Sequence, residues 1–401
     1  MTDPPPRVAT LVLVDGDGGL LGALPPFRVA TPWWQDVEPV VEAVRELHGL
    51  EVTILRLLET ELPSPQGGGV TYLAEVGDSR PTTLEPRSGA VDDDPLRATW
   101  ARPGGPDADL VWAEEALARV DLARAGAPIQ VRSWNLSSLW RLPLDRKTAW
   151  LKVVPPFFAH EGRVLDRLGG GHFPVLLGHD GPRMLLAEIP GEDLYDATLP
   201  QLLEMIAILV GLQRAWATRV DELLEIGTPD WRAPALTETI RSVVDRNAGE
   251  IAAHDRTMLA AFVAGLPARF VEIGDCGLPD TLVHGDFHPG NVRGDASNLV
   301  LLDWGDCGVG HPLLDETAFL DSITPTSIEP VRQRWHALWR EACPGSDPDR
   351  AARLLAPIGA ARQAVIYQRF LDNIESSERA YHQADPANWL QRTARLVHER
   401  A

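Results

Sequence analysis

The sequence of 401 residues exceeds the length of one ordinary domain and predicts two or three. Its 57 acidic and 37 basic residues give a formal charge of -20, which argues against a nucleic-acid or anionic membrane surface and is compatible with a cationic substrate. Three cysteines without metal-ligand spacing favour a reducing compartment. The most apolar stretch, around residues 202–212, is too short to span a bilayer, so we expect a cytoplasmic protein.

Residues 1–95 are expected to form a separate small α/β domain. Apolar runs predict strands at 8–14, 20–24, 52–58 and 70–76, and apolar side chains at helical spacing predict a helix over 37–47. The end of this helix faintly resembles a Nudix box, but Ala43 and Leu47 stand at two of its glutamate positions and only Glu46 remains. We therefore expect a non-catalytic accessory domain. Residues 92–95 and 102–106 are rich in Asp, Pro and Gly and predict a linker.

After the linker, an amphipathic helix is expected over residues 107–122, followed by strands at 129–133 and 139–144. The turn between these strands contains Ser137 and Ser138. Such a turn can present backbone N–H groups and hydroxyls to phosphate oxygens, and it is equally compatible with an ordinary hairpin.

Lys152 lies in the middle of an apolar strand, residues 148–154. It is one of only two lysines among the 37 basic residues, so arginine serves nearly every generic basic role in this chain. An ammonium group on such a strand must meet an anion or reach solvent. Glu161 lies near the start of the next predicted helix, where a negative charge is also favoured by the helix dipole.

The remainder of the chain is mostly helical by its apolar pattern. Two further strands are expected at 173–177 and 183–189, and helices at 199–224, 234–253, 257–270, 317–320, 328–339, 350–355 and 360–374.

Within this helical region, two short apolar runs at 282–283 and 299–302 read as strands that pair in a hairpin. They would bring Asp286, Asn291 and Asp303 together. Phosphoryl transfer needs such a set, because the protein mainly positions a hydroxyl and neutralises phosphate charge. One carboxylate accepts the hydroxyl proton, while a second carboxylate and an amide oxygen suit magnesium.

The run His284-Gly285-Asp286, followed by Asn291 and then by Leu302-Asp303-Trp304, resembles the aminoglycoside phosphotransferase and choline kinase-like family. The stretch from Gly310 to Asp315 resembles the continuation of that pattern, and the resemblance covers roughly residues 107–380. It implies an α+β, two-lobed protein-kinase-like fold. The β-rich N-lobe would span residues 107–188 and the helical C-lobe 189–401, preceded by the small α/β domain.

The resemblance also implies roles for individual residues. Asp286 is then the catalytic base, and Asn291 and Asp303 bind Mg²⁺. Lys152 contacts the α- and β-phosphates of ATP, with Glu161 as its ion-pair partner. Glu188 lies in the segment that joins the lobes, where main-chain groups would hold the adenine. His284 is expected to brace its loop, and His288 and Asp306 to be local turn or solvated residues.

These expectations describe an ATP-dependent O-phosphotransferase that moves the γ-phosphate to a hydroxyl of a small molecule. The acceptor could be aminoglycoside-like, an amino-sugar or an amino-alcohol. Its candidate carboxylates are Asp321, Asp372, Glu375 and Glu378, although a solvated helix face is the preferred interpretation of each. The alternative is a kinase-like nucleotide-binding protein with little turnover. A protein kinase is disfavoured because nothing after Asp303 resembles an Asp-Phe-Gly segment with a long activation loop.

Overall fold

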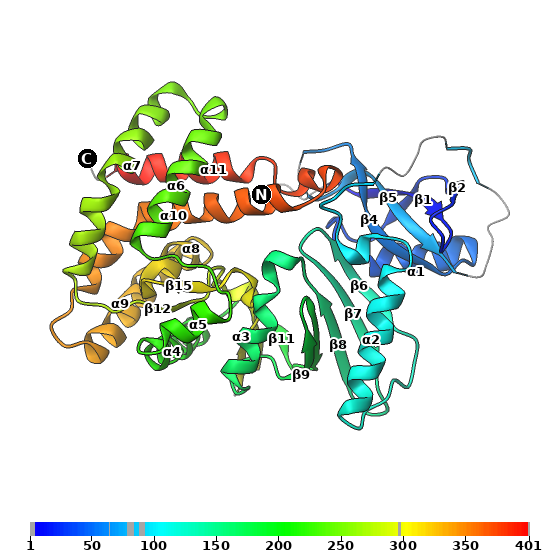
Figure 1. Cartoon of the computed structure of the whole chain (residues 1–401), viewed down its shortest axis with the longest axis horizontal. Helices are drawn as coiled ribbons and strands as arrows, with labels where there is room; N and C mark the ends of the chain where they lie inside the picture. The colour runs from blue at the N-terminus through cyan, green and yellow to red at the C-terminus, as the bar shows by residue number, and fades with distance from the viewer. Residues whose placement is uncertain (1–4, 64, 78–83, 88–92, 296–297, 400–401) are drawn as a thin grey trace. The chain divides into compact units, whose positions relative to one another are not determined.

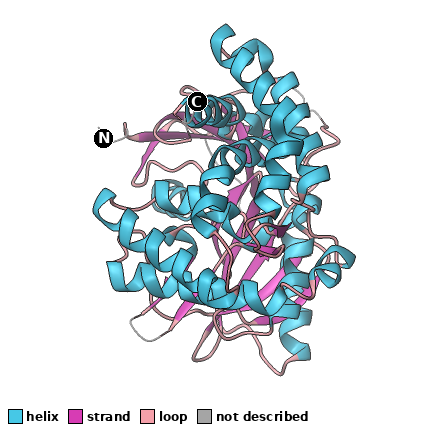
Figure 2. Ribbon diagram, turned by 90° about the vertical axis from the view of Figure 1, so that its left-hand side faces the viewer, coloured by secondary structure: helices cyan, strands magenta, loops and turns pink. Residues whose placement is uncertain are grey.

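The computed structural model describes residues 5–63, 65–77, 84–87, 93–295 and 298–399, coloured along the chain in Figure 1 and by secondary structure in Figure 2. The chain divides into two compact units, each built from separate stretches. The first contains residues 1–162, 176–188 and 370–383, and the second contains 163–175, 189–369 and 384–401. The fold is mixed α+β, as predicted, whereas the division into three domains stays a prediction.

The N-terminal part of the first unit contains every strand predicted for it, and the helix. Its elements are β1 (Arg7–Val14), β2 (Leu20–Ala23), β3 (Phe27–Val29), α1 (Glu38–His48), β4 (Val52–Thr60) and β5 (Gly68–Val76). The strand order is β2-β1-β5-β4, with β3 also on β1, and β1 runs parallel to β5. Helix α1 buries Val40 and Val44, and it ends at Gly49, whose φ of 63° suits glycine. We call residues 5–77 the first domain.

Arg7 is a fully buried cation in the first domain. Its guanidinium donates to the backbone oxygens of Trp33 (2.6 Å) and Asp36 (2.9 Å) and to the hydroxyls of Thr31 (3.0 Å) and Tyr72 (3.2 Å). Burying a charge is costly unless it is hydrogen-bonded, and both terminal nitrogens of the Arg7 guanidinium have partners. Arg7 therefore ties the loop after β3 to the sheet.

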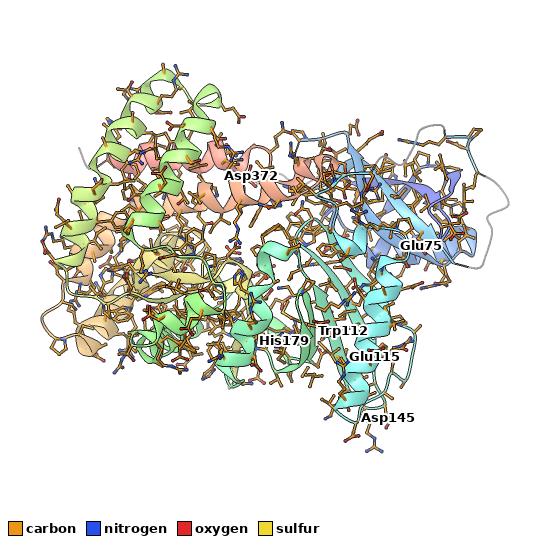
Figure 3. All side chains as sticks on the ribbon, in the orientation of Figure 1. Glu75, Trp112, Glu115, Asp145, His179 and Asp372 are labelled. Carbon is orange, nitrogen blue, oxygen red and sulfur yellow. The ribbon has the colours of Figure 1, made fainter. Side chains whose placement is uncertain are left out.

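The second sheet of the first unit has the order β6-β7-β8-β10-β9. Its strands are β6 (Ile129–Trp134), β7 (Ser137–Pro143), β8 (Thr148–Val153), β9 (Leu176–Asp180) and β10 (Arg183–Ala187). Helix α2 (Gly105–Arg119) packs on this sheet through Trp112, while Glu115 faces outward (Figure 3). The predicted linker is more ordered than expected, because Trp100 in the 3₁₀ turn η1 (Thr99–Ala101) is buried and α2 already begins at Gly105. Asp92 lies outside the described residues.

The second unit is mostly helical. Its elements are most of α3 (His160–Leu168), then α4 (Leu199–Trp216), α5 (Val220–Glu225), α6 (Ala233–Arg246), α7 (Ala253–Gly274), α8 (Glu316–Asp321), α9 (Pro325–Ala342), most of α10 (Pro348–Asn373) and α11 (Asp385–His398). Two predictions were wrong here. The expected helix over 199–224 is interrupted after Trp216. At the break, the Arg219 guanidinium carbon lies 4.1 Å from the centroid of the Trp216 ring. The two helices expected between 350 and 374 are one, because α10 continues through Pro357.

The predicted hairpin was also wrong in its pairing. Strand β12 (Thr281–Val283) pairs with β15 (Gly308–Gly310), whereas β14 (Leu299–Leu301) pairs with β13 (Val292–Gly294), and β11 (Glu192–Asp193) extends the latter sheet. The reason is that the chain reverses at Gly294, whose φ of 156° allows a close approach to Asn298. Asp286 and Asn291 lie in the loop between β12 and β13.

Helix α7 is, among the described helices, long and apolar enough to cross a membrane by length and composition. It packs against α6 and α11, and 28% of its most apolar window is buried. A core helix of a soluble protein passes the same test, so this helix alone assigns no membrane span.

Arg7→Met should destabilise the first domain by about 3 kcal/mol, because it removes the donors that satisfy buried oxygens. Urea unfolding followed by circular dichroism measures the change. Arg28→Met, at an exposed position of β3, is the matched control and should change stability by less than about 0.5 kcal/mol. Equal stabilities of the two variants would contradict the role of Arg7.

Candidate active site

The loop after β12 places Asp286 beside Asn291. The side-chain Nδ2 of Asn291 donates to the backbone oxygen of Asp286 (2.9 Å) and to its carboxylate Oδ2 (3.0 Å). Asn291 closes the 3₁₀ turn η4 (Pro289–Asn291), so its position follows from the loop conformation. Because its nitrogen is engaged with Asp286, the side-chain oxygen of Asn291 is the atom left to bind a cation.

Buried groups on both sides fix the backbone just before Asp286. The carboxylate of Asp315 accepts from the N–H groups of His284 (2.9 Å) and Gly285 (2.9 Å). His284 has its Nε2 2.8 Å from the backbone oxygen of Leu302, and burial lowers its pKa, so it serves as the neutral brace that we expected. Gly285 has φ of 95°, and a Cβ there would lie 1.9 Å from the Asp306 backbone oxygen. Only glycine fits this position.

Helix α10 holds the carbonyl of Gly285. Arg362 Nη2 donates to this oxygen at 2.8 Å, and Gln363 Nε2 donates to it at 3.1 Å. Arg362 is fully buried, and its Nη2 lies 3.8 Å from Asp315 Oδ1. Gly285, the residue that precedes the candidate base, is therefore held at its N–H by a carboxylate and at its carbonyl oxygen by a guanidinium.

Asp303 has an unusual backbone conformation. Its φ of 61° and ψ of 66° lie in the left-handed region. Among the described non-glycine residues, Asp121 is the only other one with a positive φ. Such a conformation costs about 1–3 kcal/mol and clusters at functional sites. Asp303 is exposed and precedes the 3₁₀ turn η5 (Trp304–Asp306), whose Trp304 is buried.

Asp306 lies within electrostatic range of both other carboxylates. Burial raises the pKa of Asp306 well above its usual range, and the charges of Asp286 and Asp303 add to this shift. The positive charge of Arg362 opposes it. The carboxylates of Asp286 and Asp303 thus place negative charge near Asp306, and a bound cation would offset that charge.

His288 faces the candidate base. Its Nε2 lies 3.6 Å from Asp286 Oδ2, and its Nδ1 accepts from the N–H of Gly290 at 3.1 Å, which places the proton of the neutral ring on Nε2. Burial would raise the pKa of Asp286, but the interaction with His288 outweighs it and lowers that pKa. Conversely, burial would lower the pKa of His288, and Asp286 raises it instead.

The residues expected to bind Mg²⁺ fit a hard cation. Asn291 contributes an amide oxygen beside Asp286. Asp303 contributes an exposed carboxylate whose charge acts on Asp306. Mg²⁺ commonly uses one or two carboxylates and takes further ligands from phosphates and water. The described residues include no group of three or more His, Cys, Asp or Glu that could hold a metal ion.

The first unit contains the predicted lysine–glutamate pair. Lys152 lies on β8, between Leu139 of β7 and Met184 of β10, and its Nζ is 2.7 Å from Glu161 Oε1 in α3. The two side chains are 15% and 3% exposed, so the ion pair is shielded from solvent. This arrangement fixes the ammonium group at the middle of the sheet.

The other predicted nucleotide-binding residues already have partners. The hydroxyl of Ser137 accepts from Trp134 Nε1 at 3.0 Å, and that of buried Ser138 accepts from Trp140 Nε1 at 3.0 Å. Exposed Glu188 donates its backbone N–H to Thr148 at 3.2 Å. The phosphate contacts of Ser137 and Ser138 stay predictions. Because their hydroxyls already accept hydrogen bonds, backbone N–H groups of the turn are the better candidates to bind phosphate.

The four carboxylates predicted for the acceptor do not gather in one unit. Asp321 belongs to the second unit and pairs with Arg392 at 2.9 Å, whereas the other three belong to the first. Asp372 is exposed near the end of α10 (Figure 3), but Glu375 and Glu378 are buried. Burial raises the pKa of Glu378 to about 8. Their acceptor role stays a prediction, and the packing of the two glutamates favours a structural one.

Four residues of this site were missed by the sequence reasoning. Asp315 could have been found from the sequence, since it is the last residue of the stretch from Gly310 that resembles the family pattern. His288 was assigned to a local turn, which it does cap, but it also faces Asp286. Arg362 and Gln363 carry no local signal, because their only distinguishing feature is a partner 77 or 78 residues away.

The pair of Asp286 and Asn291 and the ion pair between Lys152 on β8 and Glu161 in α3 are features that the resemblance to small-molecule kinases predicted. Residues 131–354, more than half of the chain, match the model of the phosphotransferase enzyme family. The chain belongs to this family, and it is a small-molecule kinase. A search of curated proteins found no match.

Solved structures of this family share the fold. The choline kinase LicA from Streptococcus pneumoniae is 14% identical with a TM-score of 0.52, covering 73% of this chain and 99% of that one. A macrolide 2'-phosphotransferase type I is 19% identical with a TM-score of 0.51, covering 70% and 97%. A putative aminoglycoside phosphotransferase from Ralstonia eutropha is 16% identical with a TM-score of 0.50, covering 72% and 98%. At these identities the likeness establishes the fold alone.

His288→Asn should shift the acidic limb of the kcat/KM profile to higher pH. Asn preserves the side-chain acceptor for the Gly290 N–H but removes the Nε2 that lowers the pKa of Asp286. The base is then protonated at higher pH, so activity is lost earlier on acidification. His311→Asn is the matched control, because His311 caps the Leu313 N–H in the same way. An unmoved limb in His288→Asn would contradict this role.

Proposed function

We propose that this protein transfers the γ-phosphate of ATP, bound as its magnesium complex, to a hydroxyl group of a small molecule in the cytoplasm. The observation that carries the proposal is the Asp286–Asn291 pair, in which one amide both orients the carboxylate and keeps its oxygen for a cation. Family membership supports the same reaction class.

In this reaction Asp286 accepts the proton of the acceptor hydroxyl as its oxygen forms a bond to the γ-phosphorus. The bond between the γ-phosphorus and the bridging β,γ-oxygen breaks, and ADP leaves with that oxygen. The lowered pKa of Asp286 keeps it ionised and ready to accept a proton near neutral pH. The clamp on Gly285 holds the carboxylate in position, which limits the entropy lost on reaching the transition state.

Asn291 and Asp303 would hold Mg²⁺, which supplies charge neutralisation for the phosphates. Lys152 is proposed to contact the α- and β-phosphates from the first unit. Glu161 keeps the ammonium group oriented and charged through their 2.7 Å ion pair.

A nucleotide-binding protein with little turnover is the alternative. It predicts the same lysine–glutamate pair, but it offers no reason for the clamped base or for the strained backbone of Asp303. Strain of this kind persists when surrounding structure imposes it, as at catalytic sites.

The acceptor class is proposed from charge. The formal charge of -20 favours a cationic alcohol, such as an aminoglycoside-like compound, an amino-sugar or an amino-alcohol. ATP consumption measured over panels of these compounds, with Asp286→Ala as the blank, tests the proposed reaction directly.

Asp286→Asn should reduce phosphoryl transfer by about two to four orders of magnitude and leave ATP affinity nearly unchanged, because a base acts on the chemical step. Single-turnover rates and equilibrium binding separate the two effects. Asp303→Ala provides the contrast, since loss of a magnesium ligand should weaken both MgATP binding and the rate. Wild-type turnover by Asp286→Asn would remove Asp286 from the mechanism.

The best cationic acceptor should show a KM that rises with ionic strength. Exposed charges are screened over about 8–10 Å near physiological salt, so attraction to an acidic protein weakens as salt is added. A neutral sugar alcohol is the control and should show little change. A salt-independent KM for the cationic compound, or a clear preference for the neutral one, would refute the cationic acceptor.

A further inference from the structure

The turn between β6 and β7 is held by a segment that arrives from the C-terminal part of the chain, residues 376–382. Asn135 in this turn is 6% exposed, and both ends of its amide are engaged. Its Nδ2 donates to the backbone oxygen of Glu378 at 3.2 Å, and its Oδ1 lies 3.1 Å from Nε2 of His382. The Asn135 side chain therefore fixes the turn.

Aromatic rings connect the same turn to the core of the first domain. The Trp134 ring lies 5.8 Å from the ring of His382 and 5.7 Å from that of Tyr381. Tyr381 in turn lies 5.6 Å from Trp34 and belongs to the apolar core of the first domain. The two pairs of Tyr381 with Trp134 and with Trp34 are edge-to-face, an arrangement that contributes specific geometry in addition to apolar burial.

The hairpin of β6 and β7 is also attached to the edge of the first domain's sheet. Strand β4 is at that edge, where unpaired backbone groups need partners. The side chain of Gln130 bonds both the N–H and the oxygen of Ile54 at 2.8 Å, and the Ser133 hydroxyl donates to the oxygen of Leu55 at 3.2 Å. Side chains thus replace a neighbouring strand along this edge.

Buried ion pairs anchor the returning segment. The Glu375 carboxylate lies 2.9 Å from Arg97 and 3.4 Å from Arg56, and all three side chains are less than 10% exposed. Glu378 Oε1 accepts from the N–H of Leu57 in β4 at 2.7 Å. The segment therefore has a fixed position on the first domain.

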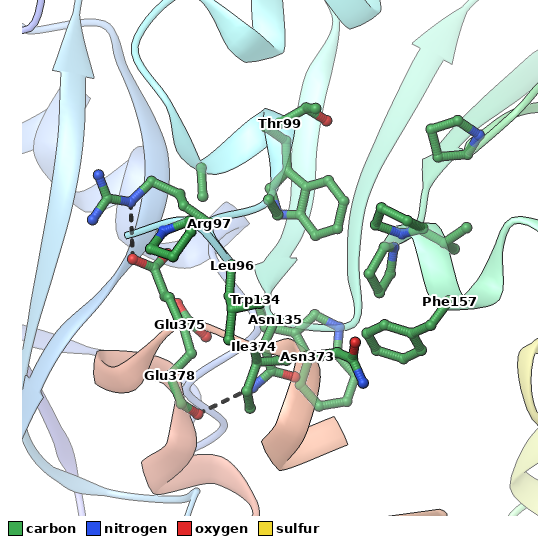
Figure 4. A pocket seen from close by; sticks show the side chains of 18 of the residues that line it. Leu96, Arg97, Thr99, Trp134, Asn135, Phe157, Asn373, Ile374, Glu375 and Glu378 are labelled. Carbon is green, nitrogen blue, oxygen red and sulfur yellow. Dashed lines mark hydrogen bonds and ion pairs between the residues drawn. The ribbon is translucent and has the colours of Figure 1, made fainter. Parts of the chain in front are cut away.

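A cavity of about 200 Å³ borders the turn (Figure 4). Trp134, Asn135 and Glu378 form part of its wall, and Phe157 lies on the opposite side. On this side the turn borders the cavity, and the hydrogen bonds of Asn135 and the ring contacts of Trp134 hold it in place.

We propose that the first domain and residues 376–382 form a brace that holds the β6–β7 turn in the conformation required to bind the nucleotide phosphates. Asn135 and His382 are its positioning residues. The inference rests on the proposed function, because it takes this turn to present its N–H groups to the triphosphate. Donors that are already oriented bind an anion without a further ordering cost, so loosening the brace weakens the phosphate contacts specifically.

His382→Phe tests the brace, since it keeps a ring against Trp134 and removes the Nε2 partner of Asn135. We expect the Kd for ATP and for ADP to rise about fivefold, the range for one lost hydrogen bond, while the Kd for adenosine stays within about twofold. His382→Gln restores an N–H donor and should recover most of the affinity. Arg379→Ala, an exposed position in the same segment, is the matched control and should change none of these values.

Unchanged ATP affinity in His382→Phe would overturn the brace, and so would equal losses for ATP and adenosine, which indicate a general structural defect. If His382→Phe does not fold, Ser133→Ala tests the attachment to Leu55, with an expected loss of about two- to threefold for ATP and ADP only. Absence of nucleotide binding by the unmodified protein would overturn the proposed function itself, which distinguishes the two failures.

Discussion

The position of the Asp286 carboxylate depends on how the backbone of the preceding residue, Gly285, is held. Gly285 has both its N–H and its carbonyl engaged by buried side chains, Asp315 on one side and Arg362 with Gln363 on the other. These charged groups sit 3.8 Å apart and compensate each other's burial. The remaining features of the site, including the bond from Asn291, presuppose this fixed backbone.

The contacts between the first domain and the hairpin of β6 and β7 have two effects. The domain's edge strand β4 would otherwise expose backbone groups, and Gln130, Ser133 and Glu378 satisfy them. The same contacts hold the hairpin that carries Asn135. The first domain therefore contributes to the fold through its contacts with the neighbouring sheet.

The loop that brings Asp286 and Asn291 together could be predicted from the sequence because these residues lie in one short stretch at fixed spacing. Its supports could not, since Arg362 reaches it across 77 residues. Glu375 looked like a solvated helix residue, yet it is buried because of Arg97, which lies 278 residues away. The pairing of β12 was wrong because strands of three residues carry too little pattern to select a partner.

The first unit is discontinuous in sequence, with its ranges meeting those of the second at 162/163, 175/176, 188/189, 369/370 and 383/384. Its last piece, residues 370–383, comes from near the end of the chain and contributes Tyr381 to the N-terminal core. A chimera that exchanges only the N-terminal domain would therefore combine its core with a Tyr381 segment from another protein. Recombination between relatives would preserve this unit only when the N-terminal domain and the distant C-terminal segment are inherited together.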